Sequence, residues 1–276
     1  MIRKVHQIVF SDLPNVPVTG YARIASESVR AAFQSCEYKC WGMDEAGEFI
    51  AEHFDDSVQT AFHCLKPFAY KADLFKYCLL YVLGGWYIDA GVKVLVSPES
   101  LFTETFKADL ILFRATGAWD APWNCSVAFI YATPGNPVFI TAIREVIANC
   151  ENKHYGENPL CPTMSPFGRA IAVHNVNKNI KMGQVVDVKS EDVRRGFRLP
   201  PLGIVGTRKP ARAKVGNVAD IGILGSNNYA ELWRKRNVYC TPKQAKSKQS
   251  FYFKDSPKLK QIIKIFKLLR MLVLKL

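Results

Sequence analysis

The stretch that most constrains the fold is residues 70–96, YKADLFKYCLLYVLGGWYIDAGVKVLV. Residues 72–83 contain neither glycine nor proline, and their apolar side chains recur at helical spacing, which predicts a helix packed on a sheet. The two glycines that follow would end that helix. Residues 86–88 are apolar and aromatic, as a buried strand is, and residues 92–96 indicate a second strand. The stretch therefore predicts helix, turn, strand, polar loop and strand.

Two carboxylates frame this unit. Asp73 falls in the first turn of the predicted helix, and Lys76 lies three residues on, on the same face. Asp89 follows the predicted strand at its carboxyl end, where ligands bind in open α/β sheets. The two carboxylates can meet at one rim because the helix would fold back along its strand. The residues alone leave two interpretations about equally open: a ligand site, or a helix-terminal charge at Asp73 and a turn residue at Asp89.

The spacing of the polar and glycine residues in this stretch resembles a known signature. DXD-type sugar transferases of glycosyltransferase family 32 share the pattern A-x-x-S-D-x-x-R-x-x-x-L-x-x-x-G-G-x-Y-x-D-x-D. That family includes yeast initiating mannosyltransferases, bacterial capsule and lipopolysaccharide transferases and, distantly, clostridial glucosylating toxins. The chain matches the pattern at Asp73, Leu80, Gly84, Gly85, Tyr87 and Asp89. The resemblance spans roughly residues 2–240 and is weak outside 70–96.

The resemblance implies a fold and an organisation. The expected fold class is α/β, a GT-A-like nucleotide-sugar-binding fold with a mainly parallel central sheet and helices on both faces. The transferase domain would occupy residues 1–240. A basic linker and an amphipathic C-terminal helix would occupy residues 241–276.

Two positions depart from the family pattern. The family arginine is Lys76, which keeps the charge but loses the bidentate fork. The second motif aspartate, which in the family usually holds the divalent metal, is Gly91. The second departure therefore bears directly on metal binding and on activity.

The resemblance also implies roles for particular side chains. The expected donor-binding residues are Phe10, Asp73, Lys76, Gly84, Gly85, Tyr87, Asp89, Asn124 and Trp233. The expected metal ligands are Asp89 and Asn228, for Mn²⁺ or else Mg²⁺. Simpler interpretations stay open for several of these positions: Phe10 as core, Asn124 as a loop residue, and residues 225–233 as an asparagine-rich turn before a helix.

The activity that the resemblance implies is sugar transfer. A hexosyltransferase would move a sugar from a UDP- or GDP-sugar to a hydroxyl of a glycan or lipid-linked glycan, with retention, in capsule or lipopolysaccharide synthesis. The leaving diphosphate must be stabilised as the anomeric C–O bond breaks, by a divalent cation or by cationic side chains. The alternative from another class is a non-catalytic sugar-nucleotide or glycan-binding protein that lost turnover with its second aspartate.

The net charge of +13 is concentrated in the tail. Residues 243–276 hold ten Lys or Arg and one acid, hence +9 of that total. Lys260, Lys264 and Lys267 form one helical stripe, and the other side of residues 257–276 is apolar, which favours binding to an anionic membrane surface. Docking on the domain or on another subunit is the alternative. A nucleic-acid partner is not expected, because a nucleic-acid-binding arm would be polar where this tail is apolar.

The first residues, the length of the apolar runs and the cysteines indicate where in the cell the protein is expected. The first residues, MIRKVHQIVF, lack the apolar core of a signal peptide, and no run of 18 apolar residues occurs. The eight cysteines form no C-x-x-C pair and several fall in apolar segments, as free thiols do in a reducing compartment. We expect a cytoplasmic protein associated peripherally with the inner face of the membrane.

Overall fold

The computed structural model describes residues 3–13, 18–101, 107–115, 124–174, 179–188, 195–208 and 216–240. The strands are β1 (Lys4–Ile8), β2 (Glu37–Trp41), β3 (Gly85–Ile88), β4 (Val92–Val94), β5 (Leu110–Arg114), β6 (Cys125–Ala132), β7 (Ile180–Asp187), β8 (Arg195–Leu199) and β9 (Gly203–Arg208). The helices are α1 (Gly20–Ala32), α2 (Met43–His53), α3 (Asp56–Cys64), α4 (Phe68–Val82), α5 (Pro137–Glu151), α6 (Met164–Val173) and α7 (Tyr229–Arg234), with short 3₁₀ turns η1 (Pro98–Leu101) and η2 (Ala219–Ile221). The predicted basic linker and amphipathic helix, 241–276, lie outside the described residues.

The strands of the described chain form one sheet in the order β2-β1-β3-β6-β5-β7-β8-β9-β4. β1 is parallel to β2 and β3, and β5 is parallel to β7, whereas the other neighbouring pairs are antiparallel. The predicted α/β class is confirmed, but the parallel part of the sheet is smaller than expected. Only residues 200–202 connect β8 to β9, and a parallel pair needs a crossover of a dozen residues or more.

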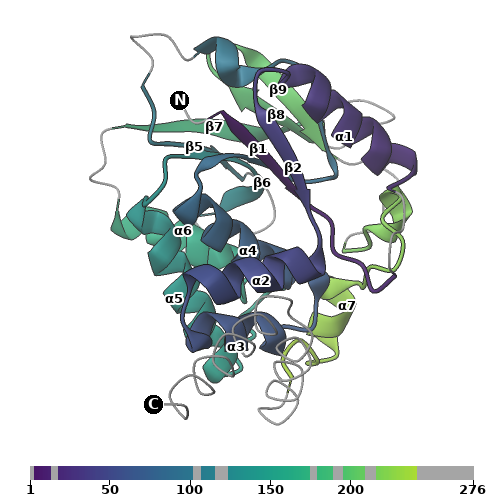
Figure 1. The fold of residues 1–276 in the computed structure, drawn as a ribbon, viewed down its shortest axis with the longest axis vertical. Coiled ribbons are helices and arrows are strands. Elements are labelled where there is room, and N and C mark those ends of the chain that lie inside the picture. Colours follow the sequence, from purple (N-terminus) through teal and green to yellow (C-terminus); the bar gives the residue numbers. More distant parts are fainter. Residues whose placement is uncertain are drawn as a thin grey trace, which may run out of the picture.

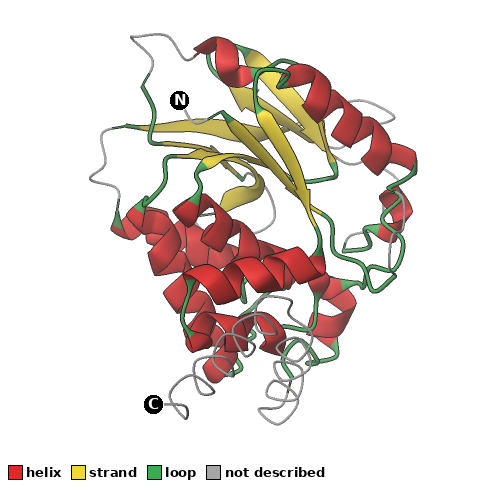
Figure 2. Cartoon of the chain, viewed as in Figure 1, coloured by secondary structure: helices red, strands yellow, loops and turns green. Residues whose placement is uncertain are grey.

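Helices cover both faces of the sheet, as expected. The larger group, α2 to α6, packs on one face, and α1 lies on the other, where it contacts β4 (Figures 1 and 2). Strand β3 serves both cores because successive side chains point to opposite faces. Tyr87 faces the core under the large helical group, whereas Trp86 and Ile88 face the core under α1.

Helix α4 begins earlier than its sequence predicts. It starts at Phe68, directly after Pro67, rather than near residue 72. Proline suits the start of a helix because the first backbone N–H groups have no partner there. Asp73 consequently lies in the second turn, and the first turn contains no acidic residue. The interpretation of Asp73 as a helix-terminal charge is therefore wrong.

The two glycines after α4 end the helix, as predicted, and turn the chain into β3. Gly84 and Gly85 have φ values of 62° and 92°. A Cβ at Gly84 would approach the carbonyl oxygen of Ala132 to 2.8 Å, and one at Gly85 would approach that of Lys4 to 2.6 Å. Both positions need glycine because of this backbone conformation and close packing.

The sheet must curl for a simple reason of chain length. Three residues, 89–91, separate β3 from β4, yet the two strands stand far apart in the strand order. Four Cα–Cα steps span at most about 14 Å. The β9–β4 edge therefore returns close to the carboxyl end of β3. In the β4–β9 register, Val92 pairs with Arg208, so a residue distant in sequence arrives beside Asp89.

Candidate functional site

An open pocket lies at the carboxyl ends of β1 and β3. Its other walls come from the first half of α4, the loop that leads into α6, and the segment 216–229. Its charged lining among the described residues consists of two acids and two bases, namely Asp73, Asp89, Lys76 and Arg208. β1 and β3 are parallel neighbours, and such strands end at the same edge, where open α/β sheets bind ligands.

Lys76 is the centre of the polar network. Its side chain is only 2% exposed, and its Nζ lies 2.9 Å from Asp73 Oδ1 and 3.4 Å from Asp89 Oδ1. It also donates to the carbonyl oxygen of Val127 at 3.1 Å and lies 4.4 Å from the centre of the Tyr87 ring. The buried ammonium group of Lys76 thus contacts both carboxylates and links α4 to the end of β3.

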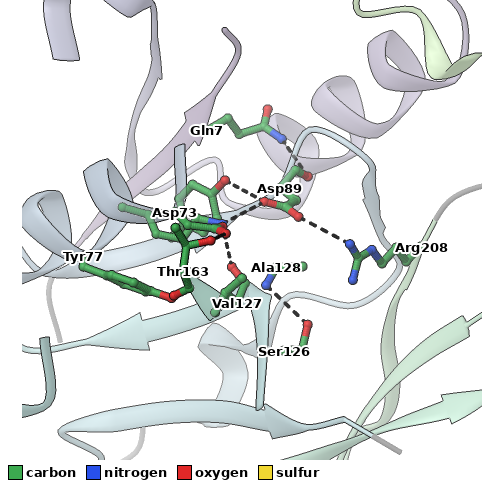
Figure 3. Close-up of polar contacts among 11 residues, drawn as sticks. Gln7, Asp73, Tyr77, Asp89, Ser126, Val127, Ala128, Thr163 and Arg208 are labelled. Carbon is green, nitrogen blue, oxygen red and sulfur yellow. Dashed lines mark hydrogen bonds and ion pairs between the residues drawn. The ribbon is translucent and has the colours of Figure 1, made fainter. Parts of the chain in front are cut away.

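Asp73 is held from a second direction by the loop before α6. Its Oδ2 accepts a hydrogen bond of 2.7 Å from the Thr163 hydroxyl. The backbone of Thr163 is fixed in turn, because its carbonyl oxygen accepts from the Tyr77 hydroxyl at 2.9 Å (Figure 3). Thr163 itself is fully buried. Both oxygens of Asp73 therefore have protein partners.

Asp89 stands between two cations. Its Oδ1 accepts a 2.6 Å hydrogen bond from the Tyr87 hydroxyl and faces Lys76. Its Oδ2 lies 4.0 Å from a guanidinium nitrogen of Arg208, which comes from the opposite side (Figure 3). The backbone carbonyl of Asp89 also accepts from Gln7 on β1. With a side chain 27% exposed, this carboxylate is held by the protein and still open to the pocket.

The tyrosines around the network are neutral donors at physiological pH. Burial raises the pKa of Tyr87 well above its usual value, and the adjacent Asp89 carboxylate raises it further. Burial likewise raises the pKa of Tyr77 and of Tyr229, the latter a pocket residue packed against Tyr70. Neutral hydroxyls can donate to carboxylates or to the oxygens of a ligand without adding charge.

Phe10 packs in the core and also lines the pocket. It is 4% exposed and packs against Phe62 and Phe75, with ring centroids 6.1 and 6.2 Å away. It also lines the pocket, beside Val9. The end of β1 thus forms an apolar wall of the site.

Several expected site residues lie elsewhere. Gly84 and Gly85 shape the backbone behind the site and do not line it. Asn124 is buried just before β6, outside the pocket lining. Trp233 donates from its indole N–H to the carbonyl oxygen of Tyr155, also outside the lining.

Asn228, an expected metal ligand, caps a helix in the structure. Its Oδ1 accepts hydrogen bonds from the backbone N–H groups of Ala230 and Glu231, at 3.0 and 3.1 Å. It is the N-cap of α7, which is the asparagine-turn interpretation that its sequence left open.

Three residues of the pocket do not stand out in the sequence. Arg208 lies in a region with many arginines, and only the β4–β9 register singles it out. Thr163 lies in a proline-rich loop, and nothing in the local pattern distinguishes its hydroxyl from that of nearby Ser165. Tyr229 follows Asn228 directly and lines the pocket. The tertiary fold, which local patterns do not encode, brings these side chains to the site.

The donor set fits the expected Mn²⁺ or Mg²⁺ ion poorly. Both oxygens of Asp73 are engaged, Gly91 supplies no carboxylate, and Asn228 caps a helix. Asp89 remains, but each of its oxygens faces a cation, so a divalent ion there would meet positive charge on both sides. No group of three or more His, Cys, Asp or Glu side chains suited to a metal occurs in the described part of the chain.

One comparison with known protein families falls on the stretch that contains Asp73 and Asp89. Residues 23–107 match the family model described as a glycosyltransferase sugar-binding region containing a DXD motif. A solved structure titled PaToxG Glycosyltransferase is similar over 63% of this chain and 69% of its own, with 12% identity and a TM-score of 0.43. A search of curated proteins found no match.

Residues 23–107 are therefore similar to a glycosyltransferase sugar-binding region. The matched residues include Asp73, Lys76, Tyr87 and Asp89 and end before Arg208.

Proposed function

We propose that this protein is a glycosyltransferase that moves a sugar from a UDP- or GDP-sugar to a hydroxyl of a glycan or lipid-linked glycan. The observation that carries the proposal is the meeting of Asp73, Lys76, Tyr87 and Asp89 in one pocket, inside the region that matches the family model. A role in surface polysaccharide synthesis follows from the resemblance of this stretch to capsule and lipopolysaccharide transferases.

The pocket offers separate surfaces for the parts of such a donor. Val9 and Phe10 supply an apolar wall suited to the flat nucleotide base. Asp73, oriented by Lys76 and Thr163, can also accept hydrogen bonds from ribose or sugar hydroxyls, because each carboxylate oxygen has more than one lone pair. Asp89 and the cations beside it lie where the strand ends, next to the small residues 90 and 91 that leave room for the diphosphate.

The protein need not form a covalent bond with the sugar in this reaction. The anomeric C–O bond breaks, its electron pair goes to the leaving phosphate oxygen, and the acceptor oxygen forms the new C–O bond. The proton of the acceptor hydroxyl passes to an oxygen of the departing diphosphate. Attack on the face that the leaving group vacates gives retention without an obligatory protein nucleophile, so we assign none.

The test is nucleotide release from a panel of UDP- and GDP-sugars, with and without candidate glycan acceptors, in manganese and in EDTA. Asp89→Asn should lower turnover about 100-fold or more, because the carboxylate that orients Lys76 and Arg208 loses its charge. The matched control is Asp44→Asn, an exposed acid on α2 outside the pocket, which should retain wild-type turnover.

The outcomes separate two classes of protein. Release or transfer from one donor that Asp89→Asn abolishes supports the transferase and names the sugar. Tight donor binding without turnover, even with acceptors present, would instead support a sugar-nucleotide-binding protein that has lost catalysis. Turnover unchanged in Asp89→Asn would exclude this pocket as the site of transfer.

We also propose that residues 257–276 bind the surface of an anionic membrane. The support is the sequence alone: a lysine stripe opposite an apolar side. Among the described helices, none combines the length and the apolar character needed to cross a bilayer. Flotation with anionic vesicles should show salt-sensitive binding that is lost when residues 257–276 are deleted. Equal binding by the deletion variant would argue against this role.

A further inference from the structure

The charge balance of the pocket floor differs from that of a metal-binding carboxylate pair. A second carboxylate at position 91 would give the β3–β4 loop two negative groups, but this chain has Gly91 there. Across from that loop, β9 places Arg208 opposite Val92. The charged lining of the described pocket is therefore two acids and two bases, with no surplus of negative charge to attract a cation.

The two bases are placed differently. Lys76 is buried, and its three N–H donors are matched by Asp73, Asp89 and the carbonyl of Val127. Arg208 is 34% exposed, and its guanidinium lies 4.0 Å from Asp89 Oδ2, farther than a hydrogen bond. Lys76 is thus committed to the protein network, whereas Arg208 presents its guanidinium to the pocket with only a loose tie to Asp89.

A guanidinium in this position suits one ligand chemistry. Its planar fork of donors matches phosphate oxygens two at a time. It lies beside the three-residue loop between β3 and β4, with Tyr229 also lining this pocket. Asp89, held by Tyr87, forms a long ion pair of 4.0 Å with this guanidinium and so keeps it at the pocket.

We propose that Arg208 binds the donor diphosphate and stabilises the charge that develops on it, so that donor binding needs no divalent metal. This inference rests on the proposed transferase function and identifies the cation that serves its leaving group. As the anomeric C–O bond breaks, the electron pair goes to the phosphate oxygen, and the guanidinium offsets the new negative charge. Arg208 thereby supplies what a metal held by a second aspartate would supply.

The test is calorimetric titration of the full-length protein with UDP and with GDP, each in EDTA and each in manganese. Wild type should bind one of them in EDTA, with little gain from manganese. Arg208→Gln should weaken that binding roughly 10- to 100-fold, the usual effect of losing a charge-assisted pair of hydrogen bonds. Arg208→Lys should fall between the two, because it keeps the charge and loses the fork.

The control is Arg198→Gln, an exposed arginine on the neighbouring strand β8 that does not line the pocket. It carries the same change of charge and should bind the nucleotide as wild type does. If Arg208→Gln bound as tightly as this control, Arg208 would not contact the diphosphate. The intermediate affinity of Arg208→Lys distinguishes a lost contact from a fold that has been disturbed.

Different results would contradict the role of Arg208 and the proposed transferase function. Binding that requires manganese, and that Arg208→Gln leaves unchanged, would overturn the inference while leaving a metal-dependent transferase. A protein that binds neither UDP nor GDP in either condition, and transfers no sugar, would overturn the transferase function and the inference with it. Gly91→Asp adds a positive readout: manganese should strengthen its nucleotide binding, while Gly91→Ala should stay metal-independent.

Discussion

His6 shows how a single buried side chain joins the elements behind the pocket. It lies on β1 and is 2% exposed. One ring nitrogen contacts the carbonyl oxygen of Gly84 at 3.1 Å, and the other accepts from the Trp41 indole N–H at 3.3 Å. The neutral imidazole satisfies both contacts, one as donor and one as acceptor. A second proton on the imidazole would place an N–H at Nδ1, facing the indole N–H of Trp41, and this hydrogen bond would be lost.

Burial lowers the pKa of His6 from 6.5 to about 4, with nearby Lys4 and Lys39 acting in the same direction. Between those values the unfolded chain binds a proton that the folded chain excludes, so acid favours unfolding. Stability should be fully present above about pH 6.5 and should fall as the pH drops towards about 4. The loss between about pH 7.5 and about pH 4.5 should be about 2.5 kcal/mol from this group.

The measurement is denaturant unfolding of wild type and His6→Gln across that range. The variant is less stable overall because its two contacts change, but its stability should depend less on pH. His53→Gln, at an exposed histidine of α2, is the control and should keep the wild-type slope. If the free energy of unfolding changed with pH equally in His6→Gln and in wild type, His6 would not be the cause of the pH dependence.

At the scale of the element, the turn between α4 and β3 is the most demanding part of the backbone. Gly84 has φ +62°, and a Cβ there would lie 2.6 Å from Pro134 Cδ and 2.8 Å from the carbonyl oxygen of Ala132. Gly135, in the loop that packs against this turn, has φ +72°, but a Cβ there would have nothing within 4 Å. The two glycines share a backbone conformation and differ in the space around them.

This difference predicts unequal costs of substitution. Gly135→Ala should lower the free energy of unfolding by about 1 kcal/mol, the cost of a left-handed conformation. Gly84→Ala should lower it by about 3 kcal/mol, because the methyl group also has to displace backbone. Urea unfolding of both variants measures the two costs. Equal losses would mean that conformation alone, and not packing against 132–134, requires glycine at position 84.

At the scale of the whole molecule, the sequence predicts the elements that lie within one stretch, but it does not predict which residues distant in sequence reach the pocket. The structure confirms the helix, the double glycine and strand β3 of the central stretch, and it brings the carboxylates at 73 and 89 together. The start of the helix differs, because α4 begins at Phe68 and Asp73 falls in its second turn. Arg208 reaches Asp89 only because the sheet curls and β9 pairs with β4. The sequence predicts Trp233 at the donor site, whereas the structure places it outside the pocket lining, with its indole N–H donating to the backbone carbonyl oxygen of Tyr155.

The same contrast explains the mixed sheet. Alternation and β-branched runs identify strands but do not state their direction. Direction depends on connection length, and the short connection at 200–202 forces an antiparallel return. The parallel strands β1, β2 and β3 are those joined by helices. The pocket therefore forms where the parallel part, which the sequence predicts well, meets the curled antiparallel part, which it does not.

A whole-molecule prediction follows from this composite pocket. A bound nucleotide stabilises the folded state and slows local opening wherever it contacts the chain. Hydrogen exchange followed by mass spectrometry, with UDP or GDP added, should slow together in four separate segments: 8–10, 68–76, 159–164 and 226–229. Each should show about a tenfold or greater slowing at saturating ligand, since linkage contributes roughly 2.7 kcal/mol at a hundredfold excess over Kd.

Asp89→Asn provides the matched control, because it weakens the site without removing any element of its walls. The same nucleotide concentration should then protect the four segments less, and by a similar proportion in each. If hydrogen exchange slowed only around Asn124 and Trp233, the nucleotide would bind there, outside this pocket. Concerted protection would instead mean that segments spread over more than 200 residues of sequence act as one binding site.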